Sequence, residues 1–272
     1  AGVFDSKGTP IAYASMNYQT HFPYPGWAEQ DPRDWWKALS VAVRKAIQES
    51  GITAQQVSAM AVDTTCCSVV ALDNSGDPLR PALIWMDVRS ANQAEQIAAC
   101  EDPALQVNSN GKGPVSAEWM IPKALWLKQN EPEIFEKATT ICEYQDYLNF
   151  HLTGRLVSSI NNVATRWHFD FSEGKTGSNK NAPISLLEKL ELSDLEKKWP
   201  EEVTKLGEVI GGLTTEAAEK LGLPAGLKVV QGGADAQIGM IGLGVVKPGS
   251  LALITGSSHL QLGLSEKPFH GE

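Results

Sequence analysis

The chain has 272 residues, 42% hydrophobic and 20% charged, which is enough for one large domain or two small ones and for a substantial core. Its 32 acidic and 23 basic residues give a net charge of −9, which argues against a nucleic-acid surface, because such a surface needs lysine and arginine to neutralise phosphates. No apolar run is long enough to span a membrane, and we expect no signal peptide.

The four cysteines predict reduced thiols rather than a disulfide framework. Cys66 and Cys67 are adjacent and would pair only with strain, and no C-x-x-C pattern occurs. The five histidines are scattered and form no ligand cluster. We therefore expect a cytoplasmic protein without a protein-bound metal cluster.

The chain begins with a strand, a Ser-Lys-Gly turn and a second strand, within residues 1–18. An amphipathic helix is predicted over residues 31–50, with Asp31 as its cap, Pro32 in its first turn and Gly51 after its end. A start inside a strand pair, and a stop straight after another, suggest a fragment.

The middle of the chain alternates between strands and helices. Strands are expected at residues 57–63 (buried), 68–73, 81–87 and 139–144, and helices at 89–100, 117–130 and 145–154, with a further short helix starting at Glu131 and a loop at 107–116.

The last third continues this alternation. It is expected to hold a charged helix at 184–200, a strand at 227–233, a helix at 235–244 and a strand pair at 250–258 and 259–265. Because several strands come in meander pairs, the pattern predicts an α/β fold with a mixed sheet and flanking helices.

Two nucleotide-binding patterns fail. Gly174-Lys-Thr resembles the end of a P-loop, but the required earlier glycine position is occupied by Phe169 and the context is a loop. Gly242 and Gly244 suggest a dinucleotide fingerprint, but the third glycine position is Lys247 and the pair ends a helix instead of starting one.

The stretch QGGAD (231–235) is a stronger candidate for a functional site than these two patterns. Its glycines let a backbone or a ligand approach closely, and Asp235 stands near a strand end and a helix start. Asp235 is either a helix cap or a general base. The strand running into Thr-Gly-Ser-Ser (255–258) is either a turn or a phosphate cradle, and together the two favour phosphoryl transfer to an alcohol.

A third cluster lies earlier in the chain. VDTTCCS (62–68) leaves a strand end with small polar groups. Trp85, Asp87 and Arg89 alternate and would share one face of a strand, which suits a polyol grip. The alternative is a core tryptophan beside a surface ion pair.

Six motifs in order resemble the FGGY family of carbohydrate kinases, specifically its N-terminal domain. They are GWAEQDPRDWW (26–36), LRPALIWMDVRS (79–90), SAEWMIPKALWL (116–127), QDYLNFHLTG (145–154), GGADAQIGMIGLG (232–244) and ITGSS (254–258). VDTTCCS is similar to the V-D-x-T pattern of ribulokinase-like members, and NNVATRWHF (161–169) is similar to their segment with a sugar-contacting basic residue, here Arg166 in place of lysine.

The resemblance implies the actin/hexokinase/Hsp70-type ATPase fold, built from RNase H-like domains, with ATP and Mg²⁺ as cofactors. It implies that Asp235 is the general base, and that Gly256, Ser257 and Ser258 meet the ATP phosphates, with Ser257 where threonine is usual. The sugar-binding residues it implies are Thr65, Cys66, Cys67, Trp85, Asp87, Arg89, Glu118 and Arg166.

In the family's terms, residues 1–272 are the N-terminal, sugar-binding domain without its first strand and phosphate loop, and without the C-terminal ATP-binding domain. We therefore expect no kinase activity from this chain alone. The expected substrate is a ketopentose such as ribulose, while xylulose or a pentitol stays open. A non-catalytic sugar sensor on the same fold, an ATPase acting on protein partners, and a homodimer also stay open.

Overall fold

The computed structural model describes residues 1–109, 115–171, 181–256 and 259–266. Its central feature is a four-stranded antiparallel sheet with strand order β3, β6, β5, β7. These strands are β3 (Glu29–Gln30), β6 (Ala82–Leu83), β5 (Val69–Leu72) and β7 (Thr140–Glu143). β5 lies in the middle, and all four of its residues are buried, because both faces of this sheet are covered.

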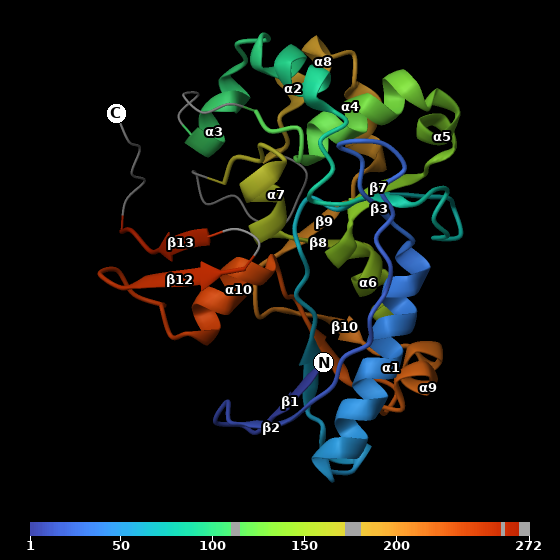
Figure 1. The fold of residues 1–272 in the computed structure, drawn as a ribbon, viewed down its shortest axis with the longest axis vertical. Coiled ribbons are helices and arrows are strands. Elements are labelled where there is room, and N and C mark those ends of the chain that lie inside the picture. The colour runs from blue at the N-terminus through green and yellow to red at the C-terminus, as the bar shows by residue number, and fades with distance from the viewer. Residues whose placement is uncertain (110–114, 172–180, 257–258, 267–272) are drawn as a thin grey trace.

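Alternate residues of β5 belong to two different hydrophobic cores. Val69 and Ala71 pack into one core, and Val70 and Leu72 into the other, as the period of two along a strand requires. The first core is covered by α2 (Ala91–Ala98), α4 (Met120–Asn130), α5 (Pro132–Lys137), α7 (Ile160–Arg166) and α8 (Ile184–Lys189). The second is covered by α1 (Pro32–Ser50), α6 (Tyr144–Thr153) and α9 (Thr215–Leu221). Figure 1 shows α2, α4, α5 and α8 gathered at one end of the molecule and α1 with α9 at the other.

Further strands form small sheets that contain both parallel and antiparallel pairs. A three-stranded sheet has the order β10 (Val209–Gly212), β11 (Lys228–Val230), β4 (Ala59–Ala61), and β8 (Val157–Ser159) pairs in parallel with β9 (Glu202–Thr204). β11 runs parallel to β4 and antiparallel to β10. The predicted mixed sheet is therefore confirmed.

Two hairpins and α10 stand apart from the central sheet. The hairpins are β1 (Gly2–Phe4) with β2 (Pro10–Tyr13), and β12 (Leu251–Thr255) with β13 (His259–Gly263). The second hairpin packs with α10 (Asp235–Gly242) around Met240, Val245 and Ala252, and this unit projects to one side of the molecule (Figure 1). The strand pairs predicted at both ends of the chain are confirmed.

The helix predicted at residues 31–50 is confirmed as α1. The side chain of Asp31 accepts a hydrogen bond from the Arg33 N–H, and Gly51 ends the helix in the left-handed region at φ 70°. Gly154 ends α6 in the same way, at φ 73°.

Three predicted elements are corrected. The strand at 57–63 shortens to β4, in which Ala59 and Ala61 are exposed, so it is not a buried strand. The strand at 81–87 ends at Leu83 and continues as a turn.

The third correction concerns the helix predicted at 184–200, which divides into α8 and a 3-10 helix (Ser193–Lys198). Glu191 adopts a positive φ of 53°, and the Leu192 N–H bonds the Leu187 carbonyl in the pattern that closes a helix C-terminus. This break lets Leu192 and Leu195 enter the first core.

The other short helices are three-residue 3-10 turns at Ala54–Gln56 and Pro103–Leu105, and α3 (Gln106–Ser109). None of the helices in the described part of the chain has the length and apolar character that a bilayer crossing needs.

The chain that leaves β11 runs parallel to the chain that leaves β4 at very short range. A Cβ atom added to Gly232 would lie 1.9 Å from the carbonyl oxygen of Val62. At Gly233 it would lie 2.7 Å from the Asn161 side-chain oxygen. The two glycines are therefore required by the approach of neighbouring groups of the protein itself.

We expect Gly232→Ala to destabilise the chain by about 2–3 kcal/mol, because the Val62 backbone has to move to make room. Urea unfolding measures this. The matched control is Gly242→Ala in α10, where an added Cβ meets nothing within 4 Å and helix propensity favours alanine. Equal midpoints for the two variants would contradict this account.

Candidate active site

The carboxyl ends of the parallel strands β4 and β11 meet at one place and carry the predicted catalytic residue. The Thr64 N–H donates to the Gly233 carbonyl at 3.1 Å, and the Asp235 N–H donates to the Thr64 carbonyl at 2.9 Å. Asn161 of α7 fixes the same turn, since its Oδ1 accepts the Ala234 N–H at 2.9 Å. Asp235 is thus placed directly beside the VDTTCCS segment.

Asp235 is exposed and is the first residue of α10. The capping position is Ala234, so the alternative of Asp235 as the helix cap is wrong. Its Oδ1 accepts the Ala236 N–H at 2.8 Å. The partial positive charge of a helix N-terminus suits a carboxylate here.

A second carboxyl group lies near Asp235. Burial raises the pKa of Asp63, and the negative charge of Asp235 raises it further. Among the described residues no group of three or more histidine, cysteine or acidic side chains could hold a metal ion. Two carboxylates do match Mg²⁺, which is usually held by one or two carboxylates together with substrate phosphates.

The Cys66–Cys67 turn follows Thr64 in the chain and therefore lies close to this junction. Cys67 has a positive φ of 65° and is held at both of its peptide groups. Its N–H donates to Glu143 Oε2 at 2.9 Å, and its carbonyl accepts from Lys123 Nζ at 2.6 Å. Cys66 is half-buried, and Thr65 contacts Ser68 through their hydroxyls at 3.4 Å.

The electrostatics of Cys66 show which groups surround it. A hydrogen bond with the Cys67 thiol lowers the pKa of Cys66, and the positive charge of Arg166 lowers it further, while burial and the charges of Glu143 and Asp235 oppose this. Burial raises the pKa of Cys67. The structure therefore brings Cys66, Arg166 and Asp235 into one neighbourhood. All four cysteines are unpaired, as predicted.

Arg166, the last residue of α7, rests on an aromatic side chain that the sequence analysis did not include in the site. Its guanidinium carbon lies 5.1 Å from the centroid of the Trp119 ring, and the His168 ring lies 5.3 Å from the same ring. Burial lowers the pKa of His168 to about 4, so it is neutral beside the arginine at pH 7. Trp119 follows the predicted site residue Glu118, a half-buried carboxylate whose Oε2 accepts from the Ser116 hydroxyl at 3.4 Å.

Trp85, Asp87 and Arg89 do not share a strand face, because the strand has ended before them. Asp87 Oδ2 accepts the Ala28 N–H at 2.6 Å and Arg89 Nη2 at 2.7 Å, and both of these side chains are fully buried. The Arg89 guanidinium also stacks 3.7 Å from the Trp27 ring. Asp87 and Arg89 hold the loop, and half-buried Trp85 is the member of this group that remains accessible.

Of the predicted phosphate residues, the structure describes Gly256, which directly follows β12. Gly256 is exposed there, and Ser257 and Ser258 lie outside the described residues.

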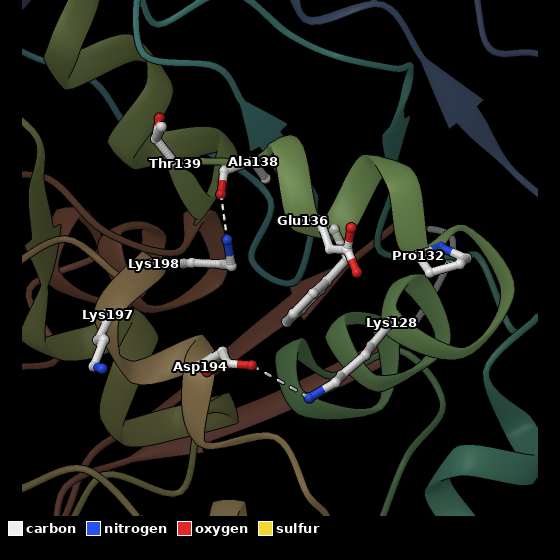
Figure 2. A pocket seen from close by; sticks show the side chains of 9 residues that line it. Lys128, Pro132, Glu136, Ala138, Thr139, Asp194, Lys197 and Lys198 are labelled. Atoms are coloured by element: carbon white, nitrogen blue, oxygen red, sulfur yellow. Dashed lines mark hydrogen bonds and ion pairs between the residues drawn. The ribbon is translucent and has the colours of Figure 1, made fainter.

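A cavity of about 580 Å³ opens between α4, α5 and the 3-10 helix, and none of the predicted site residues lines it. Figure 2 shows two of its three lysines bound to neighbours: Lys128 reaches Asp194 at 3.5 Å, and Lys198 donates to the Ala138 carbonyl at 2.5 Å. Both ammonium groups also lie near the Phe135 ring. This cavity is therefore no candidate for the active site.

The chain matches the profile of the FGGY family of carbohydrate kinases, N-terminal domain, over residues 1–242. A ribulokinase of Geobacillus thermodenitrificans is 32% identical over 265 residues, which cover 91% of this chain and 46% of the relative. An autoinducer-2 kinase of Salmonella choleraesuis is 29% identical, with 94% and 47% covered.

The crystal structure of a xylulose kinase from Rhodospirillum rubrum superposes with a TM-score of 0.79 at 27% identity, covering 90% of this chain and 49% of that chain. The predicted fold class, that of the actin/hexokinase-type ATPases, is thereby confirmed. The chain spans about half the length of the curated relatives it matches.

Beneath the turn, a buried carboxyl supports Glu143 and makes stability depend on pH. Asp146 Oδ2 accepts the Glu143 N–H at 2.9 Å. Burial raises the pKa of Asp146 well above its ordinary value, and the charge of Glu143 raises it further. The folded chain therefore keeps a proton on Asp146 that the unfolded chain has lost above about pH 4.

We expect this contribution to stability to fall as the pH rises above about 4, by up to about 1.4 kcal/mol per pH unit, until the folded pKa is passed. Asp146→Asn should remove this contribution. In urea titrations, the free energy of unfolding of the wild type minus that of the variant should therefore fall as the pH rises. Asp194→Asn, which changes a carboxyl group that is 68% exposed, is the control. Parallel curves for wild type and Asp146→Asn would contradict the assignment.

Proposed function

The chain belongs to the FGGY family of carbohydrate kinases, and from this membership we propose that it is the sugar-binding domain of an ATP-dependent sugar kinase. Residues 1–272 supply the sugar site and the general base, and ATP is shared with the second domain of such kinases. The four unpaired cysteines support a cytoplasmic location.

The observation that carries the proposal is the placement of Asp235. Its carboxylate is exposed at the start of α10, and its N–H is tied to the loop that leads into the Cys66–Cys67 turn. A carboxylate held this rigidly beside a ligand turn can take the proton from an attacking sugar hydroxyl.

In the proposed mechanism the residues of this chain bind, orient and deprotonate the sugar. Arg166 and the Thr65–Cys67 turn hold the sugar's hydroxyls, with Trp85 and Glu118 at the margin. Asp87 and Arg89 act through the loop that carries Trp85. Mg²⁺ bound with ATP would neutralise charge on the phosphate oxygens, and Asp63 and Asp235 are the carboxylates suited to stand near it. Gly256, Ser257 and Ser258 are proposed to meet the phosphates.

We propose a ketopentose, ribulose first, as the substrate. The ribulokinase relative at 32% identity and the V-D-x-T pattern at Val62–Thr65 support this choice. The xylulose kinase structure at 27% identity keeps xylulose next in order. ATP-dependent ADP release by the full-length protein with ribulose, xylulose and ribitol decides between these substrates. No turnover with any sugar would favour a sugar-sensing relative instead.

We expect Asp235→Asn to lower turnover by about two to four powers of ten, because the hydroxyl proton loses its acceptor. Ribulose affinity, measured by calorimetry, should change little. Asp194→Asn, an exposed carboxylate outside the site, is the control and should retain full turnover. Unchanged turnover in Asp235→Asn would show that another group is the base.

We expect Arg166→Met to weaken ribulose binding roughly tenfold or more, because a charged hydrogen bond to a hydroxyl is lost. Arg155→Met, a half-exposed arginine paired with Glu202, is the matched control. Equal ribulose affinity in these two variants would remove Arg166 from the sugar site.

A further inference from the structure

A lysine is completely buried inside α4, which is an unusual place for a cation. Lys123 is 0% exposed and is surrounded along the helix by buried apolar residues. Its Nζ donates to the carbonyls of Cys67 at 2.6 Å and Ile84 at 2.7 Å, with Leu83 at 3.4 Å. In the described part of the chain, no carboxylate forms an ion pair with it.

Burying this cation is unfavourable in itself. Burial lowers the pKa of Lys123 to about 8, against an ordinary value near 10.4, because the charged form is desolvated. The negative charges of Asp87 and Glu143 favour the ammonium, but from a greater distance. An apolar side chain of similar volume would fill the same space without the desolvation cost of a cation. What the lysine provides in addition is its hydrogen bonds to the carbonyls.

The carbonyls that Lys123 binds belong to two separate loops. Cys67 lies in the turn after β4, and Ile84 directly precedes the turn that carries Trp85. Cys67 is a non-glycine residue at φ 65°, a conformation that persists only when its surroundings enforce it. Glu143 holds its N–H and Lys123 holds its carbonyl, so both sides of the strained residue are fixed.

We propose that Lys123 is a positioning residue that joins the Cys66–Cys67 turn and the Trp85 turn into one rigid unit. This inference rests on the proposed function, in which these two turns carry sugar-binding groups. Lys123 acts through the backbone and touches no ligand. Its loss would let the two turns move relative to each other while the helix stays in place.

The test compares two buried thiols under native conditions. Cys67 is 3% exposed in the turn, and Cys142 is 0% exposed in β7. In Lys123→Met, maleimide labelling of Cys67 should rise about tenfold or more, because the turn loses the charged hydrogen bond from Lys123 to the Cys67 carbonyl. Labelling of Cys142 should stay unchanged, because β7 does not depend on this bond. Tandem mass spectrometry of the labelled peptide separates Cys67 from Cys66.

Leu125→Ala is the matched control, a buried residue on the same helix with no bond to either turn. It should lower the urea midpoint, because it leaves a cavity in the core, without selective labelling of Cys67. If Lys123→Met labels both thiols equally, or neither, the positioning role is wrong. Should Lys123→Met fail to fold, Lys123→Gln, a shorter neutral donor, undergoes the same comparison.

Ribulose binding, followed by tryptophan fluorescence, completes the test. Lys123→Met should bind ribulose roughly tenfold more weakly than wild type, whereas Leu125→Ala should bind as wild type does. Selective labelling of Cys67 with unchanged ribulose affinity would overturn the role in the site. If wild type itself does not bind ribulose, the proposed substrate fails, and the labelling still decides whether Lys123 closes the turn.

Discussion

The parallel pairing of β4 with β11 is the constraint on which the candidate site depends. It brings the segment after residue 61 next to the segment after residue 230, and the Thr64–Ala234 bridge continues the pairing beyond the strands. This continuation is sterically possible only because residue 232 has no side chain opposite the Val62 carbonyl. The glycines of QGGAD thus serve the backbone, and the proximity of Asp235 to the Cys66–Cys67 turn follows from that backbone contact.

Buried charge holds the loops around this junction. Glu143 accepts hydrogen bonds from the Cys67 N–H, the Asn162 amide and the Trp167 indole at 2.9, 3.1 and 2.6 Å. These donors come from two separate parts of the chain, so one carboxylate ties α7 and its following residue to the turn. Asp87 and Arg89 do the same for the Trp85 loop. Such groups are costly to desolvate, and in this structure they are buried at the points where several loops are held in a fixed geometry.

The sequence predicted the elements well where a local signal sets them. Asp31, Pro32 and Gly51 bound α1 through capping chemistry, and Gly154 ends α6. It failed at Trp85, Asp87 and Arg89, because alternation places residues on one face only if the strand continues, and here the Ala28 N–H draws Asp87 into the interior. That contact joins residues 59 positions apart, which no local pattern contains.

Two residues of the site were within reach of the sequence but were not included. Trp119 stands beside Glu118, and Lys123 interrupts the apolar run Met120–Leu127. A lysine in a helix that is apolar on every side has no solvent face to reach, so it has to find acceptors inside the protein. Which carbonyls it reaches depends on tertiary packing, which the sequence does not display.

The pair of carboxyl groups at the junction gives a physical reason for choosing Asp235 as the base over Asp63. A general base has to be ionised at neutral pH. Burial and the neighbouring negative charge both favour a proton on Asp63. Asp235 is exposed, begins α10 and accepts the Ala236 N–H at 2.8 Å, so its side chain is fixed in place and open to a ligand. The direction of the Asp63 shift and the exposure of Asp235 together support Asp235 as the proposed base.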